Sequence, residues 1–144
     1  MNIEIREHFK VEIYGFEGVA VNKDYVTKAF SLSDRMWKVV KGSELKHKGI
    51  NIWVYDDNEK VFAGVELEEK PTTETELERK TIHLARYAYY KHIGAYDQIK
   101  NSGQKMIAEL NSMGCEITQP YMEIYGHWTN DTAKLETELF MCLK

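Results

Sequence analysis

Aromatic rings and carboxylates recur on matching faces of several expected strands, where together they could hold a positively charged organic molecule. Successive side chains of a strand point to opposite faces, so residues two apart share a face. In residues 50–55, 121–125 and 135–143 this alternation separates aliphatic faces from faces that carry rings and acids. The second set comprises Trp53, Tyr55, Tyr121, Glu123, Tyr125, Glu138 and Phe140. A desolvated ring attracts a cation by roughly 0.5–2 kcal/mol, and a carboxylate adds charge complementarity.

The same side chains are also ordinary residues of a solvent-facing sheet, and alternation alone does not separate the two interpretations. Glu138 is the foremost single candidate, because it stands among apolar neighbours where a solvated residue is less expected. Trp37 flanks an expected helical stripe and belongs either to the lip of a groove or to the edge of the core. We therefore predict a ligand groove made by Glu138, Tyr125, Glu123, Trp53, Tyr55, Phe140 and Trp37.

Other site chemistry finds no support in the spacing of residues. The five histidines have no metal-ligand spacing, and Cys115 and Cys142 stand far apart outside any C-x-x-C. No nucleophile elbow or phosphate-cradling glycine loop occurs. We expect neither a metal nor a cofactor. If the chain is an enzyme, Glu138 or Glu123 would act as general acid or base with Tyr125 nearby.

Composition bounds the partners that the chain can have. It has 144 residues, 43% of them hydrophobic and 29% charged, with a net charge of −4. Lysines and arginines are scattered, whereas a duplex-binding surface needs a basic patch, so we expect no direct nucleic-acid partner. There is no apolar run long enough for a membrane helix and no signal peptide at the N-terminus. These features predict a single cytoplasmic domain, residues 1–144.

The expected elements repeat in two halves of the chain, about 8–68 and 80–144. The first half reads as a strand at 9–14, a helix opened by a capping box at Ser31–Asp34 and closed by Gly42, and strands at 50–55 and 61–67. A charged linker covers 68–80. The second half reads as a strand at 81–90, a helix capped by Asp97 and ended by Gly114, and strands at 121–125 and 135–143. The order is strand, helix, strand, strand in each half.

The second half carries a resemblance to a known family. Residues 87–96 (Tyr-Ala-Tyr-Tyr-Lys-His-Ile-Gly-Ala-Tyr), the helix after them, residues 120–125 (Pro-Tyr-Met-Glu-Ile-Tyr) and residues 137–141 (Thr-Glu-Leu-Phe-Met) resemble the gyrase-inhibitor-like (GyrI-like) family. This family supplies the effector-binding domain of bacterial AraC- and MerR-type regulators and also occurs as stand-alone proteins. The first half of the chain matches this family in the order of its expected elements more than in its amino-acid sequence. No helix-turn-helix segment precedes residue 9, so we expect a stand-alone member.

The resemblance implies an α+β fold of duplicated strand-helix-strand-strand units. These would form a concave antiparallel sheet, with two helices on one face and a ligand groove on the other. It implies non-catalytic binding of a small cationic or amphipathic molecule, for regulation or for drug sensing and sequestration. Two alternatives stay open: a hydrolase acting on small electrophilic natural products, and a protein-interaction module such as a gyrase inhibitor.

Overall fold

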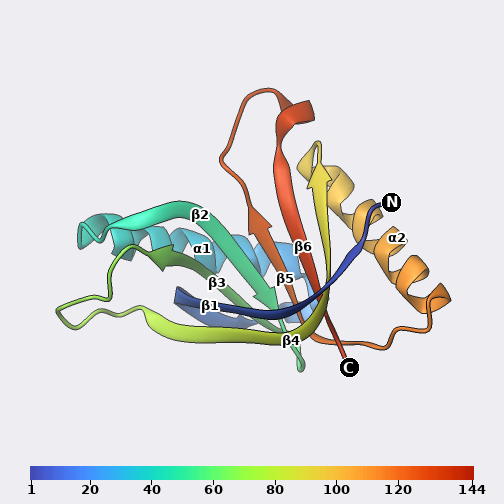
Figure 1. Ribbon diagram of the computed structural model, residues 1–144. Coiled ribbons are helices and arrows are strands. Elements are labelled where there is room, and N and C mark those ends of the chain that lie inside the picture. The colour runs from blue at the N-terminus through green and yellow to red at the C-terminus, as the bar shows by residue number, and fades with distance from the viewer.

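The computed structural model describes residues 1–144 as six strands, two α-helices and three short 3-10 turns (Figure 1). The first half contains β1 (Glu4–Val19), α1 (Tyr25–Gly42), β2 (His47–Tyr55) and β3 (Lys60–Leu67). The second half contains β4 (Glu78–Ile93), α2 (Ile99–Ser112), β5 (Ile117–Tyr125) and β6 (Glu136–Leu143). Each half thus has strands of 16, 9 and 8 residues in the same order around one helix. The predicted α+β class is confirmed.

The six antiparallel strands close into a barrel in the order β1-β3-β2-β5-β6-β4, which corrects the expected open concave sheet. Closure depends on the two 16-residue strands. β1 pairs with β4 along Glu4–Gly15 and with β3 along Tyr14–Val19, so it belongs to both sides of the sheet. β4 likewise pairs with β1 and β6. The sequence predicted only residues 9–14 and 81–90 for these strands, which is too short to join two neighbours.

Both helices begin at other residues than the sequence predicted. α1 starts six residues earlier than Ser31, because Asp24 caps it by accepting a hydrogen bond from the Thr27 backbone N–H at 3.2 Å. The Ser31–Asp34 pattern therefore lies inside the helix. Asp97 does not cap α2, since it belongs to a 3-10 turn that precedes Ile99. Neither helix is long and apolar enough to cross a membrane.

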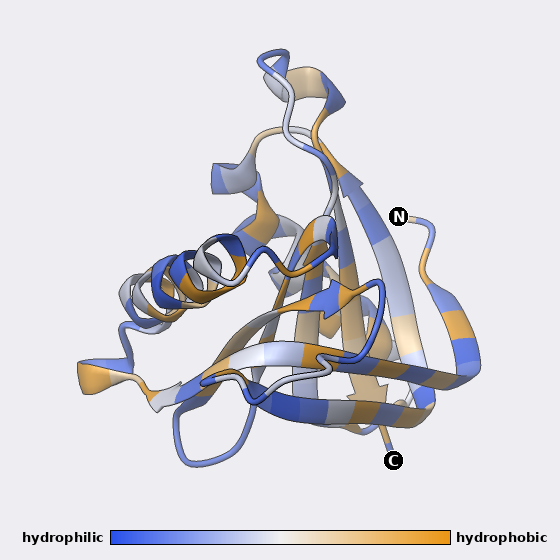
Figure 2. Ribbon diagram, turned by 90° about the vertical axis from the view of Figure 1, so that its left-hand side faces the viewer, coloured by the Kyte–Doolittle hydropathy of each residue, from blue (hydrophilic) through white to orange (hydrophobic).

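Apolar side chains form one core inside the barrel and two outside it. Hydrophobic and hydrophilic residues alternate along the strands (Figure 2), so each strand has an inner and an outer face. The inner core is built around Ile13, Ile52, Leu84 and Met122, which are at most 1% exposed. Outside the barrel, α1 packs on β1 and β3, and α2 packs on β4 and β6 (Figure 1). The two helices therefore cover separate parts of the outer face.

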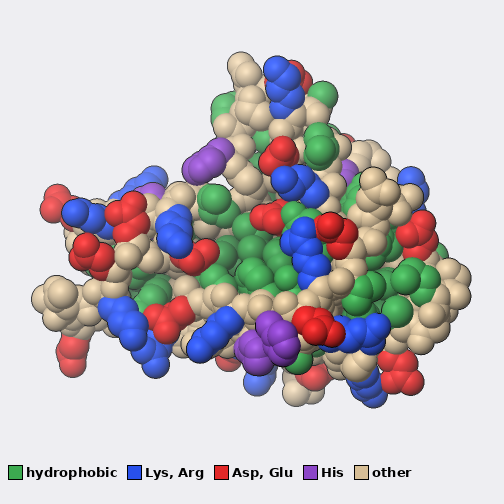
Figure 3. Space-filling model, in the orientation of Figure 1, with side chains coloured by type: hydrophobic (Ala, Val, Ile, Leu, Met, Phe, Trp, Pro, Cys, Tyr) green, Lys and Arg blue, Asp and Glu red, His purple; other side chains and the backbone are tan.

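The inner core is partly open on one side of the molecule. Figure 3 shows hydrophobic side chains gathered in a hollow over β2, β5 and β6, with charged side chains around it. Phe9, Ile124 and Cys142 are the partly buried hydrophobic residues that pack against the inner core. This opening is separate from the cavity described next, which none of these three residues lines.

Candidate functional site

A cavity of about 1100 Å³ lies on the outer face of the barrel, between the two helices. Its floor is made by β2 and β5, and its walls come from the first turns of α1, from α2 and from the segment after β5. The expected groove was on the face opposite the helices. The cavity instead lies on the helix side, because α1 packs mainly on β1 and β3 and α2 mainly on β4 and β6, which leaves part of β2 and β5 uncovered between them.

The register of β2 and β5 brings rings and a carboxylate together on the floor. Trp53 lies opposite Glu123, and Tyr55 lies opposite Tyr121. Cross-strand partners share a face, so all four side chains point to the cavity. Tyr125, two residues beyond Glu123, joins them on the same face. Strand alternation had placed these five residues together, and the structure brings them to one cavity.

Glu123 is the polar centre of this floor. Its side chain is buried, with 7% of the residue exposed. The Tyr121 hydroxyl donates a hydrogen bond to one carboxylate oxygen at 2.8 Å, and the Tyr125 hydroxyl donates to the other at 2.5 Å. No lysine, arginine or histidine forms an ion pair with Glu123. Its two carboxylate oxygens therefore accept hydrogen bonds from tyrosine hydroxyls and contact no cation of the protein.

The tyrosines around Glu123 are held in their neutral, donating form. Burial raises the pKa of Tyr125 above its ordinary value, and the charge of Glu123 raises it further. The same two causes, in the same order, raise the pKa of Tyr55 and of Tyr121. All three hydroxyls stay protonated at neutral pH, and those of Tyr121 and Tyr125 donate to the carboxylate.

Aromatic rings contact one another around the cavity. The Trp53 ring lies between Phe30 of α1 and Tyr125 of β5, in edge-on contacts with centroids 5.0 and 4.9 Å apart. Three further pairs continue the wall at centroid distances of 5.8–5.9 Å: Tyr25 with Tyr55, Tyr55 with Tyr121, and Tyr96 with Tyr125. The site therefore combines a buried carboxylate that has no cationic partner with two series of contacting aromatic rings.

The charges at the edge of the cavity have the same sign as its centre. Asp56 and Asp97 line it together with Glu123, and Lys100 is the one basic residue in the lining. Three carboxylates against one ammonium group give the cavity a negative potential, which favours entry of a cation. The whole protein, with a net charge of −4, adds to this potential.

Two predicted site residues lie on the other side of the sheet. Glu138 pairs with Ile124 in the β5–β6 register, whereas Glu123 pairs with Leu139. Glu138 and Phe140 therefore point to the barrel interior and do not line the cavity. The sequence grouped them with Glu123 because both sets lie opposite an aliphatic face. In the structure the aliphatic face of β6 packs under α2, whereas that of β5 points into the barrel. Alternation could not say which face of β6 belongs with the rings of β5.

Glu138 has an environment of its own at the opened side of the inner core. The Tyr89 hydroxyl donates a hydrogen bond to it at 2.6 Å, and burial together with Glu138 raises the pKa of Tyr89. The Tyr89 ring contacts Phe140 edge-on at 5.3 Å. The guanidinium group of Arg6 lies over the Tyr89 ring, with its Cζ atom 3.7 Å from the ring centroid. A cation of the protein itself thus already occupies this aromatic and acidic cluster.

Trp37 borders the site without lining it. Its indole N–H donates a hydrogen bond to Asn51 Oδ1 at 2.7 Å, and Asn51 does line the cavity. The Ser33 hydroxyl donates to the same oxygen at 3.4 Å. These contacts join α1 to β2, so Trp37 positions the wall of the cavity.

Sequence reasoning missed the contributions of the helices and the loop. Phe30 of α1, Ile107 of α2 and Trp128 of the β5–β6 loop line the cavity although they are 57%, 43% and 74% exposed. Gly103 of α2 lines it as well. Strand alternation carries no information on these positions. The only signal in the sequence was that Phe30, Ile107 and Trp128 are large apolar residues outside the expected strands.

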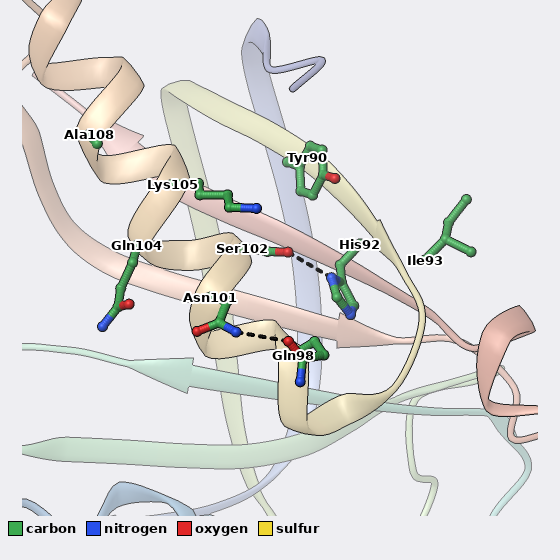
Figure 4. Close-up of a pocket in the computed structure, with 9 residues that line it drawn as sticks. All are labelled: Tyr90, His92, Ile93, Gln98, Asn101, Ser102, Gln104, Lys105 and Ala108. Atoms are coloured by element: carbon green, nitrogen blue, oxygen red, sulfur yellow. Dashed lines mark hydrogen bonds between the residues drawn. The ribbon is translucent and has the colours of Figure 1, made fainter.

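A second, smaller pocket of about 540 Å³ lies beside α2 and is mostly polar (Figure 4). His92, 6% exposed, shares a hydrogen bond with the Ser102 hydroxyl at 2.7 Å and another with the Ala95 carbonyl at 3.0 Å. Asn101 donates to Gln98 at 2.8 Å. With both ring nitrogens engaged, His92 fastens the end of β4 to the start of α2.

Comparisons with solved structures show which fold this is. The C-terminal domain of EcmrR superposes with a TM-score of 0.79 at 15% identity, over 99% of this chain and 97% of that chain. SAV2435 bound to tetraphenylphosphonium superposes with a TM-score of 0.71 at 14% identity, over 100% and 94%. A hydrolase from Listeria innocua superposes with a TM-score of 0.58 at 10% identity, over 99% and 91%.

Comparisons of sequence identify the family. No curated protein sequence matches the chain. The model of the GyrI-like small molecule binding domain matches residues 1–144, which confirms the resemblance seen in the second half and extends it over the first. The chain therefore belongs to the family of GyrI-like small molecule binding domains.

Proposed function

We propose that the chain binds a lipophilic organic cation in the cavity between α1 and α2, with Glu123 facing the positive charge. The observation that carries this proposal is the state of Glu123: it is 7% exposed and has no cationic partner. A buried carboxylate is costly unless something compensates its charge, and two tyrosine hydroxyls compensate only part of it. A ligand cation would complete the site.

The walls of the cavity support the same ligand class. Trp53 and Tyr125 border Glu123, so a cation at the carboxylate would also lie within reach of their rings. The volume of about 1100 Å³ accepts a molecule with several rings. SAV2435, which shares the fold, was solved with tetraphenylphosphonium, a cation of this kind. We propose that the chain senses or sequesters such compounds as a receptor.

Calorimetric titration with two ions of the same shape and opposite charge tests the proposal. The wild-type protein is expected to bind tetraphenylphosphonium and to reject tetraphenylborate. Glu123→Gln keeps the size of the side chain and removes its charge, so its affinity for the cation should fall ~10-fold or more.

Glu138→Gln is the matched control, because Glu138 is also a strand glutamate bonded to a tyrosine but lies outside the cavity. Its cation affinity should stay within about twofold of wild type. Equal binding of both ions by the wild-type protein would reject the proposal. Loss of binding in the Glu138 variant alone would instead favour the carboxylate that the sequence put first.

A hydrolase acting on small electrophiles is the second candidate function. The 2.5 Å hydrogen bond between Tyr125 and Glu123 favours it, since a tyrosine and a carboxylate in contact can serve as acid and base. Mass analysis of a strained electrophile incubated with the protein decides between the two. If the compound is hydrolysed and Glu123→Gln abolishes the hydrolysis, the site is catalytic. If the compound stays unchanged at saturating protein, the receptor function is supported instead.

A further inference from the structure

Gly103 occupies the middle of α2 on the side that faces the cavity. Ile99 and Ile107, one turn before it and one turn after it, also line the cavity. In a helix, residues four apart lie on one face, so these three positions form a row along the cavity wall. At Gly103 the row has no side chain, and the wall is the helix backbone itself.

Nothing in the protein requires a glycine at this position. Gly103 is not among the glycines with positive φ, so its backbone accepts any residue. A Cβ atom built there would meet nothing within 4 Å beyond the adjoining backbone of its own helix, so no close approach forbids a side chain. Glycine is nevertheless the least favourable helix residue after proline. The glycine therefore weakens α2 without any packing reason inside the protein.

We infer that Gly103 determines the size of the ligand, by leaving room for a bulky ring-bearing arm of the cation against the backbone of α2. This inference rests on the proposed function of the cavity and adds to it which part of the ligand lies where. Glu123 and Trp53 on the floor would face the charged centre. Gly103 on the α2 wall would receive an apolar substituent, bordered by Ile107.

The surroundings of Gly103 favour an apolar arm over a polar one. Ile107 is 43% exposed, although large apolar side chains of a helix are normally buried. Phe30, on the α1 wall of the same cavity, is 57% exposed. A ring placed between these walls would bury apolar surface of both helices. Binding would therefore favour cations with large aromatic substituents over compact ones.

Two substitutions at Gly103 test the inference with opposite effects on stability and affinity. Gly103→Ala should raise the melting temperature of the free protein by about 2–4 °C, because alanine favours the helix. The same methyl group takes ligand space, so affinity for tetraphenylphosphonium should fall ~3-fold. Gly103→Leu fills the space and should lower that affinity ~10-fold or more.

The matched control is Gly42, which is the last residue of α1, also has no atom within 4 Å of a built Cβ, and does not line the cavity. Gly42→Leu should bind within about twofold of wild type. If wild type binds and Gly103→Leu binds equally well, the inference is overturned while the proposed function stands. If wild type binds no cation, the proposed function fails and takes the inference with it. If Gly103→Leu does not fold, the affinity of Gly103→Ala for tetraphenylphosphonium is compared with that of wild type instead, and equal affinity overturns the inference.

Discussion

Trp53 and Glu123 face each other across the β2–β5 pairing and point to the same cavity, each buried to 7% exposure. They occupy corresponding positions in the two halves, since each is the seventh residue of its nine-residue strand. The two halves thus place an aromatic ring and a carboxylate side by side at their junction. Under the proposed function, this pairing would offer a cation both an aromatic ring and a carboxylate.

The pairing predicts that Trp53 contributes through its ring and not only through its apolar area. Trp53→Leu keeps an apolar side chain but removes the ring face, so affinity for tetraphenylphosphonium should fall roughly 2- to 30-fold. Phe140→Leu is the control, because Phe140 is also a buried aromatic residue but lies in the inner core. Calorimetry on both variants measures the difference. A similar loss of tetraphenylphosphonium affinity in both variants would mean that the ring of Trp53 makes no specific contribution to binding.

Alkaline pH should destabilise the protein through the tyrosines of the floor. The raised pKa values of Tyr55, Tyr121 and Tyr125 mean that the fold prefers their neutral form. Their contribution is therefore fully present below the unfolded-state pKa of about 10 and is lost as pH rises above it. The free energy of unfolding, measured in urea, should decline from that pH upward.

The near-ultraviolet absorbance of phenolate gives an independent measurement of the same tyrosines. The folded protein should show less phenolate than the urea-unfolded protein at a pH just above 10. Coincident titration curves for the two states would contradict the raised pKa values. In Glu123→Gln the curves should move closer together, because one of the two causes of the shift is gone.

The hydrogen bonds of Asn51 should contribute to the stability of the cavity wall. Asn51→Ala leaves the Trp37 indole N–H without its acceptor and cuts one tie between α1 and β2. Because the Trp37 indole is only partly buried, the free energy of unfolding should fall by about 0.5–1.5 kcal/mol, the net value of one hydrogen bond. Asn101→Ala removes an exposed bond to Gln98 and should cost less than about 0.5 kcal/mol. Equal costs would show that the Trp37 contact is incidental.

The sequence predicted the content of the cavity floor better than its position in the fold. Alternation along β2 and β5 is a local property, so Trp53, Tyr55 and Glu123 could be assigned to one face without knowing the tertiary structure. Glu138 does not line the cavity, because the aliphatic face of β5 points into the barrel while the aliphatic face of β6 packs under α2. Which face of a strand points into the barrel and which lies under a helix is set by long-range packing, and the sequence of a single strand does not contain that information.

The same limit explains the length of the strands and the missed wall residues. The outer parts of β1 and β4 are charged and lack the apolar pattern of a strand, as at Glu4–Glu7, yet they pair because the partner strand lies beside them. Phe30 is an exposed helix residue and Gly103 a partly buried one, and both line the cavity only because the other helix lies across it. Only the assembled fold brings these walls together.

Trp128 should report directly on occupation of the cavity. It is 74% exposed in the loop between β5 and β6, yet it lines the cavity, so a bound ligand would cover it. Trp53 is buried, and Trp37 is partly buried and bonded to Asn51. Trp128 should therefore dominate the quenching of fluorescence by acrylamide in the free protein, and tetraphenylphosphonium should reduce that quenching. The effect should vanish in Trp128→Phe and persist in Trp37→Phe. Protection that survives in Trp128→Phe would place the ligand away from this loop and closer to the strands.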